Sequence, residues 1–321
     1  MINTQGIMIN STSLLAFNRQ FPSERICKEK FKEYREKIGI KCPHCGCMHH
    51  YWIGGNVQRF QCKNCGYRQS LKANTVMHHS RLSFRYWFIT MWLIVNTKNT
   101  FSAAEIQRQL GHKYYRPIFL MLHKIRKSMG NIENSRVLSG EVEIDEAFFS
   151  TYNNGELSEL NYEGKRYKHK TPYRMKKTQV VVMCESKESR LPKKGAKITK
   201  IAGNLKMIVV PDLKYHTITN AVTGKIDSSS IVISDGTHAH KDFPNMFQKY
   251  IGKKINPEDI GRILPYVHIA IGNAKAQFRN IHHAIEKNYL QMYLNEFVWK
   301  WNRRKSDRIF NEILETAVLP L

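Results

Sequence analysis

Two pairs of cysteines, each with CxxC spacing, constrain the fold of this chain more than any other feature. Sixteen residues separate the pairs, which are made by Cys42, Cys45, Cys62 and Cys65. Two such knuckles at this distance bring four thiolates around one Zn²⁺. Gly46 and Gly66 directly follow the knuckles, where a tight turn needs a residue that tolerates positive φ. We therefore predict a structural zinc ribbon with these four ligands.

The segment between the knuckles predicts the remainder of the ribbon. Residues 50–62 read HYWIGGNVQRFQC, which is typical of a β-hairpin that turns at Gly54-Gly55. Further donors lie close by, and their participation in the zinc site stays open at this stage: Cys47, His44, His49 and His50.

The charge balance indicates the class of partner. Lys and Arg total 51 against 26 Asp and Glu, which gives a net charge of +25. Such an excess repels itself in a compact fold, so a nucleic acid is the expected partner. An RNA binder of the ribosomal type and a membrane-surface protein are the alternatives. The most apolar run, residues 86–95, is shorter than the ~20 residues that a membrane span needs. We expect a cytoplasmic protein without a membrane segment.

Residues 101–127 have the pattern of a helix-turn-helix. Ser102 is expected to cap the first helix, with Glu105 completing a capping box, and Gly111 to make the turn. The second helix has a buried stripe at Ile118, Leu122 and Ile125. Its basic and aromatic residues are the predicted DNA contacts. These are Lys113, Tyr115, Arg116, Lys124 and Lys127. A plain helical hairpin is the alternative interpretation.

From Gly140 onward the pattern changes to short strands that alternate with helices. This alternation predicts a mixed sheet flanked by helices. The expected strands are 142–149, 179–183, 206–210 and 230–234, and the expected helices are 214–225, 238–250 and 269–304.

Two aspartates occupy unusual places in this second half. Asp145 lies inside the apolar strand EVEIDEAFF, where a buried carboxylate is costly unless it is paired or binds a cation. Asp235 ends the apolar run SIVISDG. Two aspartates at the ends of two strands can meet across a sheet and hold Mg²⁺. Each aspartate taken alone is also compatible with a turn or cap.

Further groups are candidates for the same site. Asn273, in VHIAIGNAKAQ, offers a neutral oxygen from a following helix. Glu143 and Glu146 are alternative ligands, although Glu146 should point away from the face that Glu143 and Asp145 share. Near the C-terminus, YLNEFVWKWNRR predicts a helix with one aromatic face and phosphate contacts from Arg303 and Arg304.

Together these segments resemble the insertion-sequence transposases that carry a zinc-ribbon head and a DDE-type, RNase H-like domain. The matching segments are CPHCG…CKNCG, VEIDEAFF, ISDG, VHIAIGNAKA and YLNEFVWKWNRR, in the family order over about residues 20–310. The resemblance implies a catalytic triad of Asp145, Asp235 and Asn273. Asparagine stands where most DDE enzymes have glutamate, as an accepted variant in the zinc-ribbon group. His268 also matches the family and is expected to support the site.

The resemblance also implies an activity. The expected protein is a prokaryotic, nucleoid-associated DNA transposase that binds the ends of its element, cleaves DNA and transfers strands by Mg²⁺-dependent in-line phosphoryl transfer. Mn²⁺ is an expected substitute. Its partners would be double-stranded transposon ends and target DNA, bound by a homodimer or higher oligomer. A domesticated or inactive DNA-binding copy and a nuclease without strand transfer remain alternatives.

These features predict a multidomain α+β protein. The expected parts are a flexible tail (1–21), a helix with the zinc ribbon (22–72), a helix-turn-helix-like DNA-binding region (73–137), an RNase H-like α/β catalytic domain (138–312) and a tail (313–321).

Overall fold

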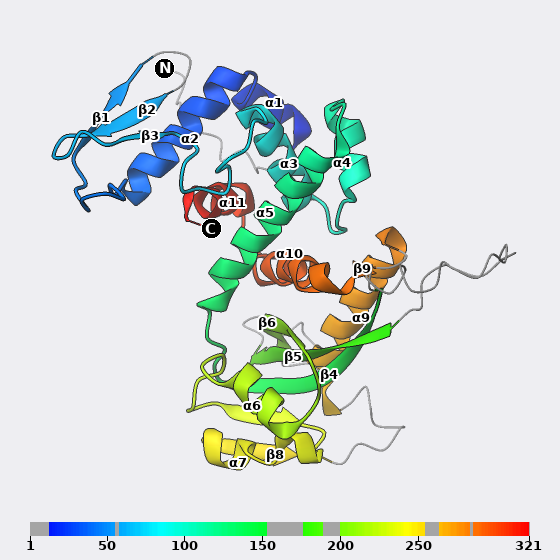
Figure 1. Cartoon of the computed structure of the whole chain (residues 1–321). Helices are drawn as coiled ribbons and strands as arrows, with labels where there is room; N and C mark the ends of the chain where they lie inside the picture. The colour runs from blue at the N-terminus through cyan, green and yellow to red at the C-terminus, as the bar shows by residue number, and fades with distance from the viewer. Residues whose placement is uncertain are drawn as a thin grey trace, which may run out of the picture. The chain divides into compact units, whose positions relative to one another are not determined.

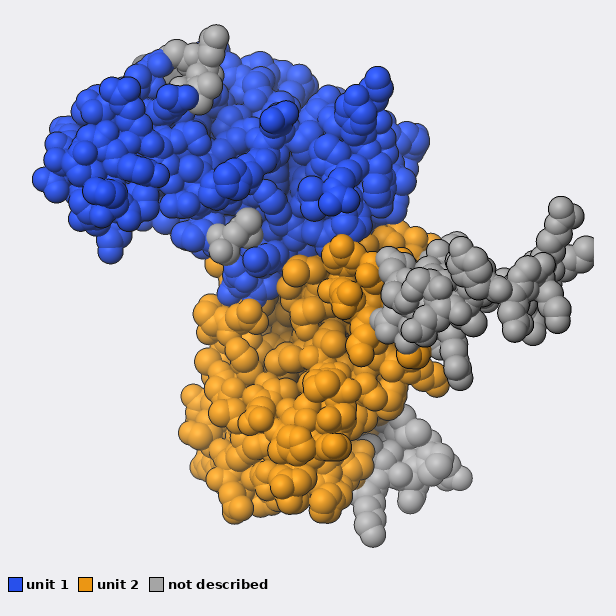
Figure 2. All heavy atoms as spheres, viewed as in Figure 1, with its two compact units in different colours: residues 1–131, 305–321 blue, residues 132–304 orange. Residues whose placement is uncertain are grey.

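The computed structural model describes residues 13–54, 58–152, 176–188, 200–253, 263–282 and 285–320. The chain is divided into two compact units, which Figure 2 distinguishes by colour. Unit 1 comprises residues 1–131 and 305–321, and unit 2 comprises residues 132–304.

Unit 1 contains the ribbon and a set of helices (Figure 1). Its helices are α1 (Leu14–Gln20), α2 (Glu24–Ile38), α3 (Phe84–Asn96), α4 (Ala103–Leu110), α11 (Ile309–Val318) and most of α5 (Tyr115–Asn134). Its strands are β1 (His50–Ile53), β2 (Arg59–Cys62) and β3 (Arg68–Ser70), in one antiparallel sheet of order β1-β2-β3.

The hairpin predicted between the knuckles is confirmed. Ile53 and Arg59 form the strand pair nearest the turn. Residues 55–57 lie outside the described part of the chain. The helix expected after Pro22 is also present, because the Ser23 side chain accepts a hydrogen bond from the backbone N–H of Ile26 at 3.4 Å.

An aromatic cluster joins the two ends of unit 1. Phe17 of α1 lies 5.4 Å from Trp92 of α3 and 5.6 Å from Phe310 of α11, measured between ring centroids. Phe17 and Phe310 are only 4% and 2% exposed. Where tails were expected at 1–21 and 313–321, residues 14–20 and 309–318 are thus packed helices, since burial of aromatic rings outweighs their short length. Residues 1–12 lie outside the described part.

The two helices predicted over 101–127 are α4 and α5. Ser102 accepts a hydrogen bond from the backbone N–H of Glu105 at 3.1 Å, while the Glu105 carboxylate binds Arg108 and Gln109. Gly111 ends α4 with a left-handed φ of 60°. The predicted stripe of α5 is buried, and its members are Ile118, Leu122 and Ile125.

Unit 2 is built on a mixed sheet, as predicted. Its strands are β4 (Glu141–Tyr152), β5 (Lys176–Glu188), β6 (Lys200–Val210), β7 (Ile231–Ser234), β8 (Lys249–Gly252) and β9 (Ile285–Glu286). The order is β6-β5-β4-β7-β8, and β9 also pairs with β4. Strand β5 is antiparallel to both β4 and β6, whereas β7 and β9 run parallel to β4, and β8 runs parallel to β7.

Helices cover both faces of this sheet (Figure 1). On one face α9 (Pro265–Ile281) and α10 (Leu290–Asn302) pack on a core that includes Ala147, Val182 and Leu205. On the other face α6 (Tyr215–Val222) and α7 (Phe243–Met246) pack on a core that includes Val142 and Ile144. Odd positions of β4 therefore face α9, and even positions face α6 and α7.

Two expected helices of unit 2 differ in the structure. The helix expected at 238–250 is reduced to a 3₁₀ turn, η2 (His238–His240), and the short α7, because residues 249–252 pair with β7 as strand β8. The helix expected at 269–304 is divided into α9 and α10. Between them lie strand β9, which pairs with β4, and a second 3₁₀ turn, η4 (Lys287–Tyr289). In both cases pairing with the sheet overrides the local helical pattern.

None of the helices in the described ranges has the length and apolar content needed to cross a membrane.

Candidate functional site

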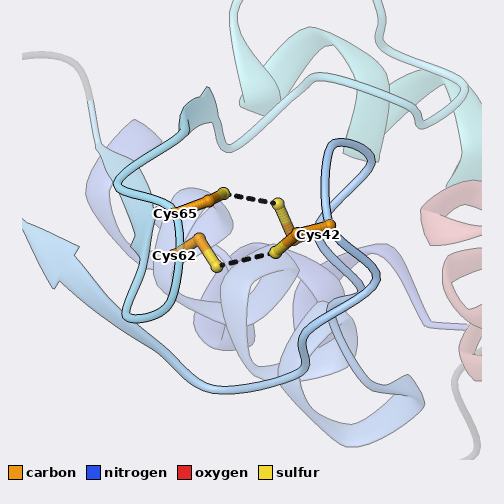
Figure 3. Close-up of side chains that lie close together, drawn as sticks. Cys42, Cys62 and Cys65 are labelled. Atoms are coloured by element: carbon orange, nitrogen blue, oxygen red, sulfur yellow. Dashed lines mark hydrogen bonds between the residues drawn. The ribbon is translucent and has the colours of Figure 1, made fainter.

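The four cysteines of the ribbon converge on one point. Figure 3 shows the sulfur atoms of the labelled cysteines directed toward one another from two loops. The Sγ atoms of Cys42 and Cys65 are 3.6 Å apart, and those of Cys45 and Cys62 are 3.5 Å apart. All four lie within 4.8 Å of one another. Four thiolates at about 2.3 Å from a tetrahedral Zn²⁺ are about 3.8 Å apart, so the group fits structural zinc.

The knuckle backbone favours thiolates at Cys45 and Cys62, whereas the neighbouring sulfur atoms raise the pKa of Cys65. Backbone N–H groups of Cys65 and Asn64 oppose the effect of desolvation and lower the pKa of Cys62 to about 6. The N–H of Cys47 likewise lowers the pKa of Cys45. By contrast, the Cys47 sulfur lies outside the four-sulfur group and accepts from the N–H of His49 at 3.4 Å. Thiolates are the form that binds zinc.

A second candidate site lies where β7 ends beside β4. The two strands are parallel, and Glu143 pairs with Ile233. The same register continued by two residues brings Asp145 next to Asp235, just beyond the last paired position. Gly236 follows with a φ of 71°, which turns the chain away from the sheet. The two aspartates singled out in the sequence are thus neighbours along the backbone register at the carboxyl end of β7.

Asp145 is held from the α9 side. Its Oδ2 lies 3.0 Å from Nε2 of His268 in α9, and its Oδ1 accepts the backbone N–H of Glu146 at 2.9 Å. Both side chains are partly exposed, at 21% for Asp145 and 24% for His268. This contact keeps one carboxylate oxygen directed at the helix, in agreement with a supporting position for His268.

Asp235 belongs to a second group that sequence reasoning missed. Nδ1 of His240 lies 3.3 Å from Oδ1 of Asp235, and Nε2 of His240 lies 2.8 Å from Oε1 of Glu146. The imidazole is fully buried and bridges the two carboxylates. Glu146, Asp235 and His240 could hold a metal ion, since their ligand atoms all lie within 4.8 Å. The opposite orientation of Glu146 was expected, but nothing in the sequence connected it with His240.

The contacts of His240 with Asp235 and Glu146 shift the pKa values of His240 and Asp235 in opposite directions. Burial alone would lower the pKa of His240, but Asp235 and Glu146 raise it to about 9. In the opposite sense, burial would raise the pKa of Asp235, yet His240 and the N–H of Thr237 hold it below its ordinary value. At neutral pH His240 is therefore a buried imidazolium, and its positive charge is balanced by the two carboxylates that it contacts.

Glu143 has a structural position. Its Oε2 accepts the backbone N–H groups of Tyr266 and Val267, each at 2.8 Å, at the start of α9. The side chain is only 3% exposed, and desolvation raises its pKa to about 7 despite those hydrogen bonds. Glu143 thus satisfies free N–H groups of the first helical turn and fixes α9 against β4.

Asn273 lies elsewhere on α9. It is exposed, five residues after His268, and therefore about 140° around the helix axis from it. It makes no hydrogen bond to Asp145 or Asp235 among the described contacts. The strand register therefore aligns the backbones of Asp145 and Asp235, while the described contacts direct Asp145 to His268 and Asp235 to His240 and include none from Asn273 to either aspartate.

The expected DNA contacts fall into two groups. Lys113, Tyr115, Arg116 and Lys127 are exposed on or next to α5. Lys124 is half-buried and donates to the backbone carbonyl of His78, and desolvation lowers its pKa. Four of the five are thus available to a partner, and Lys124 is engaged inside unit 1.

Arg303 and Arg304 make contacts inside unit 2 where phosphate contacts were expected. Arg303 forms an ion pair with Glu133, whose side chain is 6% exposed, and stacks 4.3 Å from the centre of the Trp299 ring. Arg304 donates to the carbonyl oxygens of Ala202 and Gly203 in β6. Both guanidinium groups anchor the end of α10, because each finds acceptors in its own domain.

Comparisons with known proteins agree on one family. Residues 137–302 match the ISXO2-like transposase domain, and residues 22–68 match the transposase zinc-ribbon domain. The chain is also 25% identical over 133 residues to a protein of Halobacterium salinarum described as an uncharacterized protein in transposable element ISH50. The similar region covers 40% of this chain and 43% of that protein, which is less than half of its length.

Proposed function

The chain belongs to the ISXO2-like transposase family, and on that premise we propose that it cleaves the ends of a DNA element and transfers them to a target. The observation that carries this proposal is the parallel register of β4 and β7, which, continued by two residues, aligns the backbone of Asp145 with that of Asp235 at the carboxyl end of β7. Paired carboxylates on a chain of net charge +25 fit the handling of phosphodiesters, because they recruit cations where the remainder of the surface attracts DNA.

The donor set fits a hard divalent cation. Asp145, Asp235 and Glu146 offer carboxylate oxygens, which Mg²⁺ prefers, and Mn²⁺ is a proposed substitute. When bound, such ions lower the pKa of an attacking water and stabilise the leaving oxygen of an in-line displacement. Asp145 and Asp235 are the proposed principal ligands, and Glu146 is a further donor on the far side of the His240 bridge.

The surrounding groups orient these carboxylates. His268 contacts Oδ2 of Asp145 and the backbone N–H of Glu146 donates to Oδ1, so both oxygens of this carboxylate are oriented. His240 holds Asp235 and Glu146 in place and offsets their repulsion with its positive charge. Asn273 is proposed as the third ligand on the strength of the family resemblance, and His268 is its geometric rival.

The two units suggest a division of roles. We propose that unit 2 is the RNase H-like catalytic domain, which the mixed sheet flanked by helices supports. Unit 1 is proposed to bind the element ends through the zinc ribbon and a helix-turn-helix formed by α4 and α5. The exposed residues at the start of α5 support this role, because that end of a recognition helix usually meets base edges.

The experiment incubates the full chain with Mg²⁺, a labelled duplex that carries its own element ends and a supercoiled target plasmid. Products are resolved as nicked ends and as joined molecules. Asp145→Asn serves as the matched variant, since it keeps side-chain size and removes the charge. We expect wild-type protein to give both products and Asp145→Asn to bind DNA but give neither.

Three outcomes would contradict the proposal in different ways. Cleavage without joining identifies a nuclease without strand transfer. Specific binding without cleavage by the wild type identifies a domesticated DNA-binding protein. Near-normal cleavage by Asp145→Asn shows that the catalytic site has been placed wrongly.

A further inference from the structure

One edge of β4 has an open stretch beside the aspartates. β5 pairs with β4 from Glu141 to Thr151, so it occupies one edge along nearly the whole strand. The other edge pairs with β7 at residues 141–143 and with β9 at residues 151–152. Between these two contacts, residues 144–150 have no strand partner on that edge among the described residues. Asp145 lies at one end of this open stretch.

A pocket lies at the other end of the same stretch. It has a cavity volume of about 400 Å³ and is lined by parts of β4, β5, α9 and β9. Its polar and aromatic lining includes Phe148, Lys177, Lys275, Arg279 and His282. We propose that this edge pocket binds an unpaired nucleotide of the DNA strand whose phosphate lies at Asp145 and Asp235. This inference rests on the proposed function and deepens it by naming a substrate subsite.

The charge of the pocket is the first argument. Lys177 comes from β5, while Lys275 and Arg279 come from α9, so three cations from two elements surround one cavity. Its described lining contains no acidic residue. Lys177 and Arg279 are exposed. A concave site with one sign of charge focuses its field on the cavity and attracts the phosphates of a nucleic acid.

The aromatic character is the second argument. Phe148 is 42% exposed, although large aromatic rings are normally buried, and it lines the pocket from the open edge of β4. An exposed ring at a cavity whose lining also carries cations suits single-stranded nucleic acid, because every base has a face that can stack on such a ring. The combination favours a nucleotide over a simple anion, which would need no aromatic ring, and over an apolar ligand, which would need no cations.

The location fits a strand that passes the aspartates. Phe148 is three residues beyond Asp145 along β4, so it lies roughly 10 Å away at about 3.3 Å per residue. That is about three steps of a stacked strand at 3.4 Å each. The base in the pocket is therefore expected about three nucleotides from the phosphate at the aspartates. It must be unpaired and unstacked, because the neighbouring base pairs of a duplex cover both faces of a base inside it.

The test uses photo-cross-linking, which reports position instead of total affinity. The full chain without Mg²⁺ is mixed with a short single-stranded oligonucleotide that carries 5-iododeoxyuridine, irradiated and mapped by mass spectrometry. We expect a cross-link in the peptide that contains Phe148. Phe148→Leu should remove it and weaken oligonucleotide binding about fivefold, whereas Phe148→Trp, which restores a stacking face, should retain both.

Charge is tested with a matched pair of variants. Lys177→Gln removes a cation from the pocket, and Lys249→Gln removes another exposed lysine, at the start of the edge strand β8. The slope of log K against log salt for the oligonucleotide should fall by about 0.7 for Lys177→Gln. It should not change for Lys249→Gln.

The outcomes separate this inference from the proposed function, since neither measurement requires cleavage. A Phe148 cross-link in a protein that never cleaves DNA would support the pocket and refute the transposase activity. Cleavage by a protein that lacks the cross-link, with equal salt slopes for the two lysine variants, would refute the pocket alone. A duplex that cross-links to Phe148 as well as the single strand does would also refute it, because both faces of a base inside a duplex are already covered by its neighbours.

Discussion

The Asn273→Ala variant tests the point at which family resemblance and geometry diverge. Asn273 lies near the middle of α9, which spans Pro265–Ile281, and its side chain is exposed. It makes no hydrogen bond to Asp145 or Asp235 among the described contacts. Alanine has the higher helix propensity at such a position, by up to about 0.7 kcal/mol. The free energy of unfolding is therefore expected to stay the same or to rise slightly.

Catalysis should respond differently. A contact to a metal ion or a developing charge is typically worth ~3 kcal/mol, or roughly a hundredfold in rate. If Asn273 is the third ligand, Asn273→Ala should lose about that factor, and part of the loss should be recovered at higher Mg²⁺. Asn273→Asp keeps an oxygen at the same reach, so it should retain more activity than the alanine variant.

The assay compares single-turnover cleavage and melting temperature for three alanine variants of α9. His268→Ala removes the 3.0 Å contact with Asp145, and Ile269→Ala is the control, since that side chain is 50% exposed on the same helix. We expect Ile269→Ala to cleave normally. If Asn273→Ala cleaves at the wild-type rate and His268→Ala loses most of its cleavage rate, Asn273 is not the third ligand. The ligand role would then be assigned to His268.

Three further predictions concern stability. Cys62→Ser should abolish the binding of one Zn²⁺ per chain and unfold the ribbon, since structural zinc contributes on the order of 10 kcal/mol; full zinc content by mass spectrometry would contradict this. Arg303→Met should cost about 1–3 kcal/mol in unfolding free energy, because the buried carboxylate of Glu133 loses one charged partner and keeps Arg136 and Asn302. A large drop in DNA affinity at unchanged melting temperature would instead favour the phosphate contact first expected. Lys206 is 4% exposed, and burial lowers its pKa to about 8 from the ~10.4 of an unfolded lysine. The cost of the buried charge is complete below pH 8 and fades as the pH rises toward 10. The unfolding free energy of wild type relative to Lys206→Met should therefore rise by on the order of 2–3 kcal/mol over that range. A difference that stays constant with pH in denaturant titrations would contradict this prediction.

Local features of the fold were predictable from the sequence. The zinc ribbon depends on four ligands within a short segment, whose spacing alone defines the tetrahedron. The starts of α2 and α4 follow from Ser23 and Ser102, since a capping side chain acts on the next turn of the same helix. The strand around Asp145 follows from its apolar pattern. Each of these rests on contacts between residues that are close in the chain.

Elements that depend on distant partners were not predictable. Residues 249–252 form a strand because β7 offers an edge for pairing, not because of their own pattern. Helices α1 and α11 are stable because Phe17 and Phe310 meet across nearly the whole length of the chain. Arg303 looked like a phosphate contact because Glu133, its partner, is 170 residues away. A pattern within one segment carries no information on such pairings.

The candidate site divides in the same way. The sequence by itself determined that Asp145 and Asp235 end or interrupt apolar strands, because a carboxylate in such a run stands out locally. Only the tertiary structure decided that these strands are parallel neighbours, that His240 bridges Asp235 to Glu146, and that Glu143 holds the start of α9. The physical reason is that hydrogen bonds and desolvation depend on which side chains meet in space. Burial between two acids raises the affinity of an imidazole for a proton, and no spacing along the chain encodes that encounter.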